Sequence, residues 1–318
     1  MKICITGATG FIGKALCQKL IERNDVLAIV RNLNNSALKK DNKLKLIEIN
    51  DINENTDLKS HFKGVDCLIH CAAKAHSMKK VTPKEIKDYQ DYNVNLTYNL
   101  AEQAALANIK RIIFISSVKV NGEETRINSK FNHDDDPLPK DPYGLSKLEA
   151  EKILRKISAR YNKIEFCIIR PPLVYGPGVK GNFLNLLKLI SKGLPLPLGK
   201  INNLRSLIGL DNLVDLIICC ISHPKARNQV FLASDCEDIS TTDLINKLSK
   251  HMNKSIINFP LPVFLIRLAG KFFNKSSEVE KLVGFLRLDA SHTRNTLGWA
   301  PPYNLDYGLS QTVNWFLK

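Results

Sequence analysis

The sequence predicts an α/β fold with a doubly wound parallel sheet, and two observations lead to this prediction. Short, β-branched segments that are apolar throughout alternate with helical patterns along the first half of the chain. The chain has 318 residues, 44% of them hydrophobic, which is enough to bury a sizeable core.

The predicted strands and helices follow one another in a regular order. The strands are the segments KICIT, VLAIV, LKLIEI, DCLIHCA, RIIFIS and EFCIIR. Helical patterns cover residues 11–23, 58–63 and 85–106, and a charged amphipathic helix begins near residue 143. Such alternation places helices on both faces of a parallel sheet.

The regularity weakens after residue 172, where Pro/Gly-rich pieces such as PPLVYGPG and KGLPLPLG interrupt short helices. We therefore expect a first domain over 1–172 and a smaller lobe over 173–318, with some later segments returning to the first domain. The apolar stretch 260–273 is too short and too interrupted by charge to span a bilayer. A helix that caps the lobe is the preferred interpretation, and a helix lying on a membrane surface is the alternative.

The formal net charge of +15 admits nucleic acid, an acidic membrane surface or a small anionic substrate as a partner. The basic residues are scattered along the chain, and no nucleic-acid-binding motif accompanies them. We therefore predict that the protein has no nucleic-acid partner. Of the three partners, a phosphate-bearing substrate that the positive charge steers to the protein is preferred. A lysine-rich surface that is simply solvated explains the net charge at least as well.

The eight cysteines contain no CxxC pair and are interpreted as reduced, buried thiols. A metal site on Cys67, His70, Cys71 and His76 is the alternative, but neighbouring residues of a strand point to opposite faces, so no metal is predicted. The amino-terminal sequence lacks the longer apolar core of a signal peptide, which favours the cytoplasm.

A glycine-rich loop follows the first predicted strand and opens the first helix. In ITGATGFIGKAL the early glycines, Gly7 and Gly10, allow a tight turn and bring N–H groups to a pyrophosphate, and Gly13 lets the helix pack closely on the strand. An ordinary glycine-rich turn is the alternative, but the strand before and the helix after favour a Rossmann-type dinucleotide site.

The cofactor is expected to be NADP or NAD. Arg31 ends the second strand, where a guanidinium suits a 2′-phosphate, and NAD is not excluded. Asp51 and Ile52 follow the third strand and are placed to meet the adenine. The segment from His70 to His76 ends the fourth strand beside the expected pyrophosphate and ribose, and neither histidine is assigned a catalytic role.

Tyr143 and Lys147 are four residues apart, so on a helix both side chains project from one face. A tyrosine is a poor base at neutral pH because its pKa is about 10. Positive charge from Lys147 and an oxidised nicotinamide favours the phenolate, so Tyr143 can exchange a proton with a substrate hydroxyl or ketone.

Ser117 ends the fifth strand and is expected to hydrogen-bond the same reacting oxygen, with Ser116 as the neighbouring candidate. Asn95 is expected to orient Lys147 through water, although asparagine in a helix is often only a packing or capping residue.

These motifs, from TGATGFIG through SSVKVNG, PYGLSK and RPPLVYGPG to LGWAPPYNLDYGL, cover essentially the whole chain. The chain resembles an extended short-chain dehydrogenase/reductase of the sugar-nucleotide epimerase, dehydratase and reductase superfamily. The resemblance implies the catalytic residues Ser117, Tyr143 and Lys147. It implies dinucleotide contacts from Gly7, Thr9, Gly10, Phe11, Ile12, Gly13, Arg31, Asp51, Ile52, Ala72, Ala73, Asn95, Lys147 and Pro171. It implies contacts to a UDP-sugar from Lys119, Asn182, Phe183 and Arg205.

Within that superfamily the chain is most similar to the bacterial surface-polysaccharide (O-antigen, lipopolysaccharide) branch, which is often labelled 4-epimerase and includes a UDP-N-acetylquinovosamine-forming 4-reductase. Three departures affect the sugar contacts. Asn121 replaces an aromatic residue, Leu173 stands where an asparagine is common, and no RxGD motif precedes Asp289.

The resemblance and Arg31 together favour an NAD(P)H-dependent 4-reductase acting on a UDP-4-keto-6-deoxy-N-acetylhexosamine over a UDP-sugar 4-epimerase with tightly held NAD. A 4,6-dehydratase is disfavoured because Val118 follows Ser117 where that branch uses an acid pair. A dinucleotide-sensing regulator is the alternative from another class, although such proteins usually lack the Tyr/Lys pair. A homodimer through the helices at 85–107 and 143–160 is implied by the resemblance alone.

Overall fold

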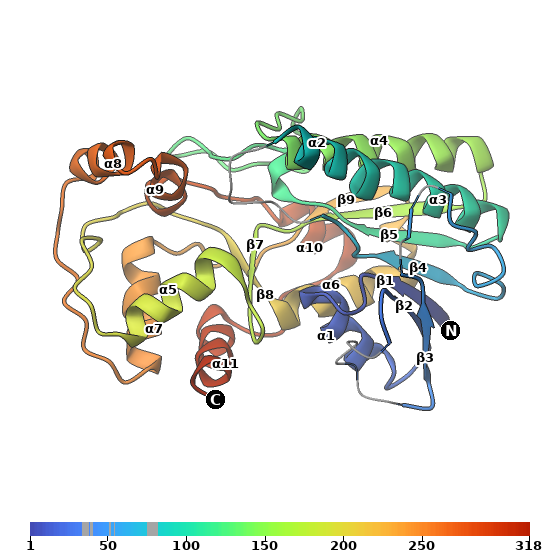
Figure 1. Cartoon of the computed structure of the whole chain (residues 1–318), viewed down its shortest axis with the longest axis horizontal. Helices are drawn as coiled ribbons and strands as arrows, with labels where there is room; N and C mark the ends of the chain where they lie inside the picture. The colour runs from blue at the N-terminus through green and yellow to red at the C-terminus, as the bar shows by residue number, and fades with distance from the viewer. Residues whose placement is uncertain (34–37, 39–40, 51, 54, 75–81) are drawn as a thin grey trace.

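The computed structural model describes residues 1–33, 38, 41–50, 52–53, 55–74 and 82–318, and a seven-stranded sheet forms its larger part (Figure 1). The strands lie in the order β3-β2-β1-β4-β5-β6-β9, and all neighbours are parallel. Their bounds are β1 (Lys2–Thr6), β2 (Asp25–Val30), β3 (Leu44–Glu48), β4 (Cys67–His70), β5 (Arg111–Ile115), β6 (Glu165–Arg170) and β9 (Gln229–Leu232). The predicted doubly wound sheet is confirmed, and its strand order reverses between β1 and β4.

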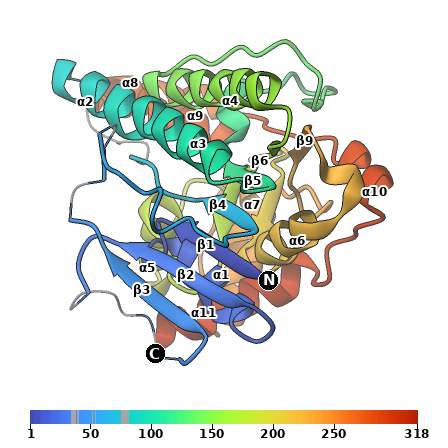
Figure 2. The ribbon, with the colours of Figure 1, turned by 90° about the vertical axis from the view of Figure 1, so that its right-hand side faces the viewer.

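Each strand is apolar throughout because both of its faces are covered. On β1, Ile3 and Ile5 pack into the core beneath α1 and α6, and Cys4 points to the opposite core beneath α3 and α4. Figure 2 shows the sheet between these two helical layers. The helices that cover it are α1 (Phe11–Leu20), α3 (Leu96–Leu106), α4 (Pro142–Tyr161) and α6 (Leu210–Ser222).

A second, smaller part of the molecule lies beyond the carboxyl ends of the strands, at the left of Figure 1. Its elements are β7 (Leu173–Tyr175), β8 (Leu207–Gly209), α5 (Gly181–Ser191), α7 (Thr241–His251), α8 (Val263–Phe272), α9 (Ser276–Val283) and α11 (Leu305–Leu317). They share a core of their own, which includes Tyr175, Leu187, Leu248 and Leu309. The polar ligands of a doubly wound sheet bind at these carboxyl ends, next to the smaller part.

Several segments after residue 172 contribute to the larger part. Strand β9 completes the sheet beside β6, α6 covers one face, and α10 (Ser291–Leu297) packs near β9. The division of the chain at residue 172 stays a prediction. None of the helices in the described part of the chain is both long and apolar enough to cross a bilayer.

Two predicted helices differ from the structure. Residues 58–63 form successive turns that bury Leu58 and Phe62, because so short a segment does not repay the cost of helix nucleation. The expected helix over 85–106 is divided into α2 (Pro83–Tyr89), a π-helical segment over Gln90–Asn95 and α3.

Candidate functional site

The glycine loop between β1 and α1 is built so tightly that side chains do not fit. Gly7 has φ +71°, and a Cβ added there would lie 2.6 Å from the backbone nitrogen of Ala72. A Cβ on Gly13 would lie 2.2 Å from the carbonyl oxygen of Gly7. These two positions therefore exclude every other residue without movement of the backbone.

The amino terminus of α1 offers uncapped N–H groups. Gly10 is the N-cap and supplies no side-chain hydrogen bond, and the first turn carries no acidic residue. Thr9 and Gly10 are exposed, while Phe11 and Ile12 are partly buried. Since the positive end of a helix attracts anions, this loop fits the pyrophosphate of a dinucleotide.

The other predicted dinucleotide residues surround this loop in different ways. Arg31 is exposed directly after β2, and Ile52 packs partly buried against the core under α3. Ala72 and Ala73 follow β4, and buried Pro171 follows β6 and accepts a hydrogen bond from the Val118 N–H at 3.0 Å. Asp51 and His76 lie outside the described residues.

His70 is a buried, hydrogen-bonded residue of β4. Its Nδ1 lies 2.7 Å from the Thr6 hydroxyl, and its Nε2 lies 3.0 Å from the Thr97 hydroxyl. Burial and, secondarily, the charge of Lys147 lower the pKa of His70 to about 3. Within the part of the chain that the structure describes, no group of three His, Cys, Asp or Glu side chains is arranged to hold a metal ion.

The buried neutral His70 predicts a pH-dependent stability. Its folded pKa is lower than the unfolded value of about 6.5, so the unfolded chain binds the proton first as the pH falls. We expect His70 to cost the fold about 2 kcal/mol between about pH 7 and about pH 5. Urea unfolding at both pH values tests this in the parent and in His70→Gln, whose amide retains partners for both threonines. An unchanged pH dependence in His70→Gln would contradict the prediction.

Ser117 and the start of α4 are brought together by a close backbone approach. Ser117 caps the short 3-10 turn Val118–Val120 through the Lys119 N–H at 3.2 Å. A Cβ on Gly144 would lie 2.9 Å from the Lys119 carbonyl oxygen, so only glycine lets α4 pack on this turn. Asp141 caps α4 by accepting from the Gly144 N–H at 2.7 Å, and it also pairs with the Lys119 ammonium.

Lys119, which is predicted to contact the sugar nucleotide, forms ion pairs within the protein. Its ammonium is held by Asp141 and, at 3.2 Å, by Glu123. In this structure the lysine joins the serine turn to the first turn of α4.

Tyr143 and Lys147 project from the same face of α4, as their spacing predicts. The Lys147 Nζ is buried, donates to the Ile115 carbonyl oxygen at 2.8 Å and lies 4.4 Å from the centroid of the Phe114 ring. Burial lowers the pKa of this ammonium to about 8. Lys147 is thus fixed at the carboxyl end of β5, beside Ser116 and Ser117.

The surroundings of Tyr143 in the structure favour its protonated form. Burial first, and then the nearby Asp141 carboxylate, raise the pKa of its hydroxyl above the ordinary value of about 10. Its ring meets that of Tyr89 edge-on at 6.0 Å between centroids. Both effects favour the protonated hydroxyl at neutral pH, and the influence of Lys147 and an oxidised nicotinamide on the phenolate stays a prediction.

The contacts of the Asn95 side chain lie within its own helix, and its water-mediated contact with Lys147 stays a prediction. Its amide group bonds Gln90 at 3.3 Å and Asp91 at 3.5 Å, whereas Asn93 is buried and donates to the Ser146 hydroxyl of α4 at 2.9 Å. The Asn93 amide also accepts from the Lys74 N–H at 2.7 Å. The π-helical segment changes the phase of the helix, so the asparagine that faces α4 is the one two residues earlier.

A buried network that the sequence analysis missed supports the catalytic helix from behind. Arg170 of β6 makes a two-pronged pair with Glu151 of α4, at 3.0 and 2.7 Å. The Ser116 hydroxyl donates to the same carboxylate at 2.5 Å. Arg170 also donates to the Asn121 side chain at 3.0 Å, which in turn donates to the Asn132 carbonyl oxygen at 2.8 Å. Asn121, which replaces the aromatic residue usual in the family, thus joins Arg170 to the loop at Asn132.

The other three predicted substrate residues belong to the smaller part of the molecule. Asn182 is partly exposed in the first turn of α5, and the buried Phe183 ring stacks on Tyr175 at 5.8 Å. Arg205 donates to the Gly284 carbonyl oxygen at 3.1 Å, and burial lowers its pKa to about 10. Lys281 of α9 also has a lowered pKa, because of burial and then the nearby charge of Lys119.

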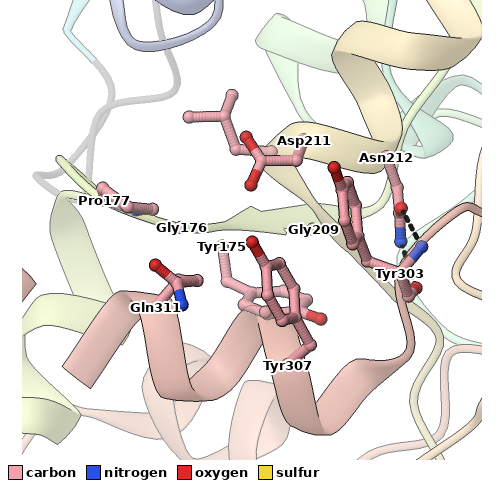
Figure 3. Close-up of a pocket in the computed structure, with 11 residues that line it drawn as sticks. Tyr175, Gly176, Pro177, Gly209, Asp211, Asn212, Tyr303, Tyr307 and Gln311 are labelled. Carbon is pink, nitrogen blue, oxygen red and sulfur yellow. Dashed lines mark hydrogen bonds between the residues drawn. The ribbon is translucent and has the colours of Figure 1, made fainter. Parts of the chain in front are cut away.

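A small recess between β7, β8 and α11 is lined by none of the predicted site residues (Figure 3). Tyr303 and Tyr307 stack there at 4.6 Å, and the Asn212 amide donates to the Tyr303 carbonyl oxygen at 2.8 Å. Beneath it, Asp235 accepts from the Tyr175 hydroxyl at 2.7 Å. These contacts join the carboxyl-terminal segment to the smaller part, and we interpret the recess as structural.

A glycine loop that fits a pyrophosphate, with Ser117, Tyr143 and Lys147 on the neighbouring strand and helix, defines a dinucleotide-dependent enzyme of the short-chain dehydrogenase/reductase type. The chain belongs to the NAD dependent epimerase/dehydratase family, whose model matches residues 3–233. The nicotinamide cofactor of this family is NAD, so the cofactor class predicted from the loop is confirmed.

Two relatives match almost the whole chain. A UDP-glucose 4-epimerase from Vibrio cholerae is 46% identical over 317 residues, which are 99% of this chain and 95% of the relative. An N-acetyl-alpha-D-glucosaminyl-diphospho-ditrans,octacis-undecaprenol 4-epimerase from Escherichia coli O157:H7 is 29% identical, over 98% and 94% of the two chains. The structure is also similar to a UDP-glucuronic acid 4-epimerase from Bacillus cereus solved with NAD, with a TM-score of 0.82, 24% identity, and coverage of 100% and 99%. At this sequence identity, the similarity to the Bacillus cereus structure shows a shared fold.

Proposed function

We propose that this chain is a UDP-sugar 4-epimerase. The observation that carries the proposal is the 46% identity to a UDP-glucose 4-epimerase along 99% of the chain, together with an intact Ser117, Tyr143 and Lys147 set. The 4-reductase that Arg31 had favoured is not confirmed and becomes the second candidate. Arg31 remains exposed after β2, where a guanidinium suits a 2′-phosphate.

The residues fit a reaction at a sugar C4 carbon. The glycine loop would hold the pyrophosphate of the dinucleotide, which would supply a hydride acceptor and donor for that carbon. Tyr143 would move the proton of the C4 oxygen, and Ser117 would hold that oxygen by a hydrogen bond. Epimerisation begins with oxidation of the C4 hydroxyl, so Tyr143 would first accept the proton of that hydroxyl and later return it. Burial opposes the ionised form of Tyr143 that this requires, and the Lys147 ammonium is the positive charge that would favour it.

The sugar nucleotide is proposed to bind between the two parts of the molecule. Asn182, Phe183 and Arg205 would hold the nucleotide diphosphate. Burial already opposes the positive charge of Arg205, and burial together with Lys119 opposes that of Lys281, so a bound diphosphate would stabilise both cations. A homodimer through α2, α3 and α4 stays a prediction.

One experiment separates the two candidate reactions. Purified protein is incubated with UDP-glucose or UDP-N-acetylglucosamine, the sugar is followed by proton NMR, and nicotinamide absorbance is recorded at the same time. We expect interconversion with the galacto isomer and no net change in absorbance. The second sample contains UDP-4-keto-6-deoxy-N-acetylglucosamine with NADH or NADPH, and stoichiometric oxidation there without epimerisation would replace the proposal by the 4-reductase. Dinucleotide binding without turnover in either sample would favour a regulator that senses the dinucleotide and catalyses no reaction.

A further inference from the structure

Helix α8 carries an exposed apolar face at the extremity of the smaller part (Figure 1). Phe264, Leu268 and Phe272 are spaced four residues apart and therefore share one side of the helix. All three are exposed, Phe272 to 82%, and the adjacent Phe273 is exposed to 68%. Single exposed apolar residues are ordinary, but a contiguous face with three phenylalanines indicates a contact.

The opposite side of α8 is fixed to the protein. Ile266 is buried in the core of the smaller part, and a Cβ on Gly270 would lie 2.6 Å from a Val279 methyl group of α9. Arg267 pairs with Glu280 of α9 at 2.8 and 3.0 Å. The exposed face is thus held outward by a helix that packs on the protein through Ile266 and Gly270.

The chain segment that carries this face is basic, and the acidic Glu280 of α9 is paired with Arg267. No acidic residue occurs between Asp243 and Glu278, a segment with six basic residues, Lys247, Lys250, Lys254, Arg267, Lys271 and Lys275. Lys271 and Lys275 are exposed on either side of the Phe272–Phe273 pair. An apolar helix face bordered by lysines is suited to the boundary between acyl chains and anionic headgroups.

We propose that the α8 face, defined as Phe264, Leu268, Phe272, Phe273, Lys271 and Lys275, docks this protein on an anionic lipid bilayer surface. The face does not suit a second copy of the chain. A ten-residue helix is about 15 Å long and about 10–12 Å wide, so its footprint is well below the roughly 800 Å² per partner of a stable interface. A two-fold symmetric contact would also bring Lys271 and Lys275 of one copy close to the same lysines of the other, and these like charges repel.

Vesicle flotation tests this proposal without substrate, so its outcome is independent of the reaction that the enzyme catalyses. The parent chain is mixed with phosphatidylcholine vesicles or with vesicles containing phosphatidylglycerol as well. We expect flotation with the anionic vesicles, a decrease of about tenfold or more for the double variant Phe272→Ser, Phe273→Ser, and loss of the anionic preference for Lys271→Gln, Lys275→Gln. All substituted side chains are exposed, and circular dichroism confirms that each variant folds.

The control removes two exposed apolar residues elsewhere, Leu106→Ser on α3 and Leu317→Ser on α11. Its vesicle binding stays within about twofold of the parent's. A parent chain that does not float, or a Phe272→Ser, Phe273→Ser variant that floats like the control, overturns the proposal. A parent dimer in sedimentation velocity that becomes monomeric in that variant also overturns it, since a second copy would then cover the face.

Discussion

Replacing Tyr143 by phenylalanine is expected to lower kcat by about 1,000-fold while the protein stays folded, because proton transfer by a positioned side chain contributes about 10²–10⁴-fold. The substitution removes one hydroxyl and keeps the ring that meets Tyr89 in the first turn of α4. Epimerisation of UDP-glucose, followed by proton NMR, measures the rate. Thermal unfolding and dinucleotide binding show whether the fold and the cofactor loop are retained.

Tyr89→Phe is the matched control for this prediction. Tyr89 is buried and its ring contacts that of Tyr143 edge-on, so the control removes a hydroxyl from the same neighbourhood without touching the proposed proton donor. We expect its kcat to stay within about fivefold of the parent's. If Tyr143→Phe retained a rate close to that of the control, the assignment of Tyr143 would be wrong.

The parts of this site that the sequence predicts well are those determined by local pattern. The strand and helix that flank the glycine loop follow from apolar runs and periodicity, and the loop's glycines have backbone reasons that are visible in the sequence. The common face of Tyr143 and Lys147 follows from helix geometry alone.

The parts that were not predicted depend on helix phase and on long-range contacts. Asn93 and Asn95 look alike in the sequence, and only the π-helical turn decides which of them faces α4. The ion pair of Lys119 with Asp141 crosses 22 positions of the chain. The raised pKa of Tyr143 likewise reflects burial, which follows from tertiary packing that no single motif reports.

The pair of Glu151 and Arg170 illustrates the same limit, since nothing in either local sequence indicates that the two side chains meet. Both are almost fully buried, and Arg170 donates to both carboxylate oxygens. The network joins α4, β6 and the end of β5, one turn of α4 beyond Lys147. We therefore assign Glu151 and Arg170 a positioning role behind the site.

Arg170→Met is expected to lower the free energy of unfolding by about 3–5 kcal/mol, because it leaves a buried carboxylate without its partner. The double variant Glu151→Leu, Arg170→Met removes both charges, and we expect it to regain most of that stability. Urea unfolding of the two single variants and the double variant forms the cycle. Lys247→Met breaks the exposed pair with Asp306 at 2.9 Å and should cost less than about 1 kcal/mol.

Activity separates positioning from simple stabilisation in the same variants. The double variant lacks the carboxylate that accepts from Ser116, and Ser116 precedes Ser117 in the chain. We expect it to recover stability but to keep a kcat about tenfold or more below the parent's, with a smaller change in KM, because small displacements of catalytic groups are costly. A double variant that recovers both stability and kcat would mean that the network only stabilises the fold. An Arg170→Met variant as stable as Lys247→Met would mean that the buried pair contributes no more than an exposed one.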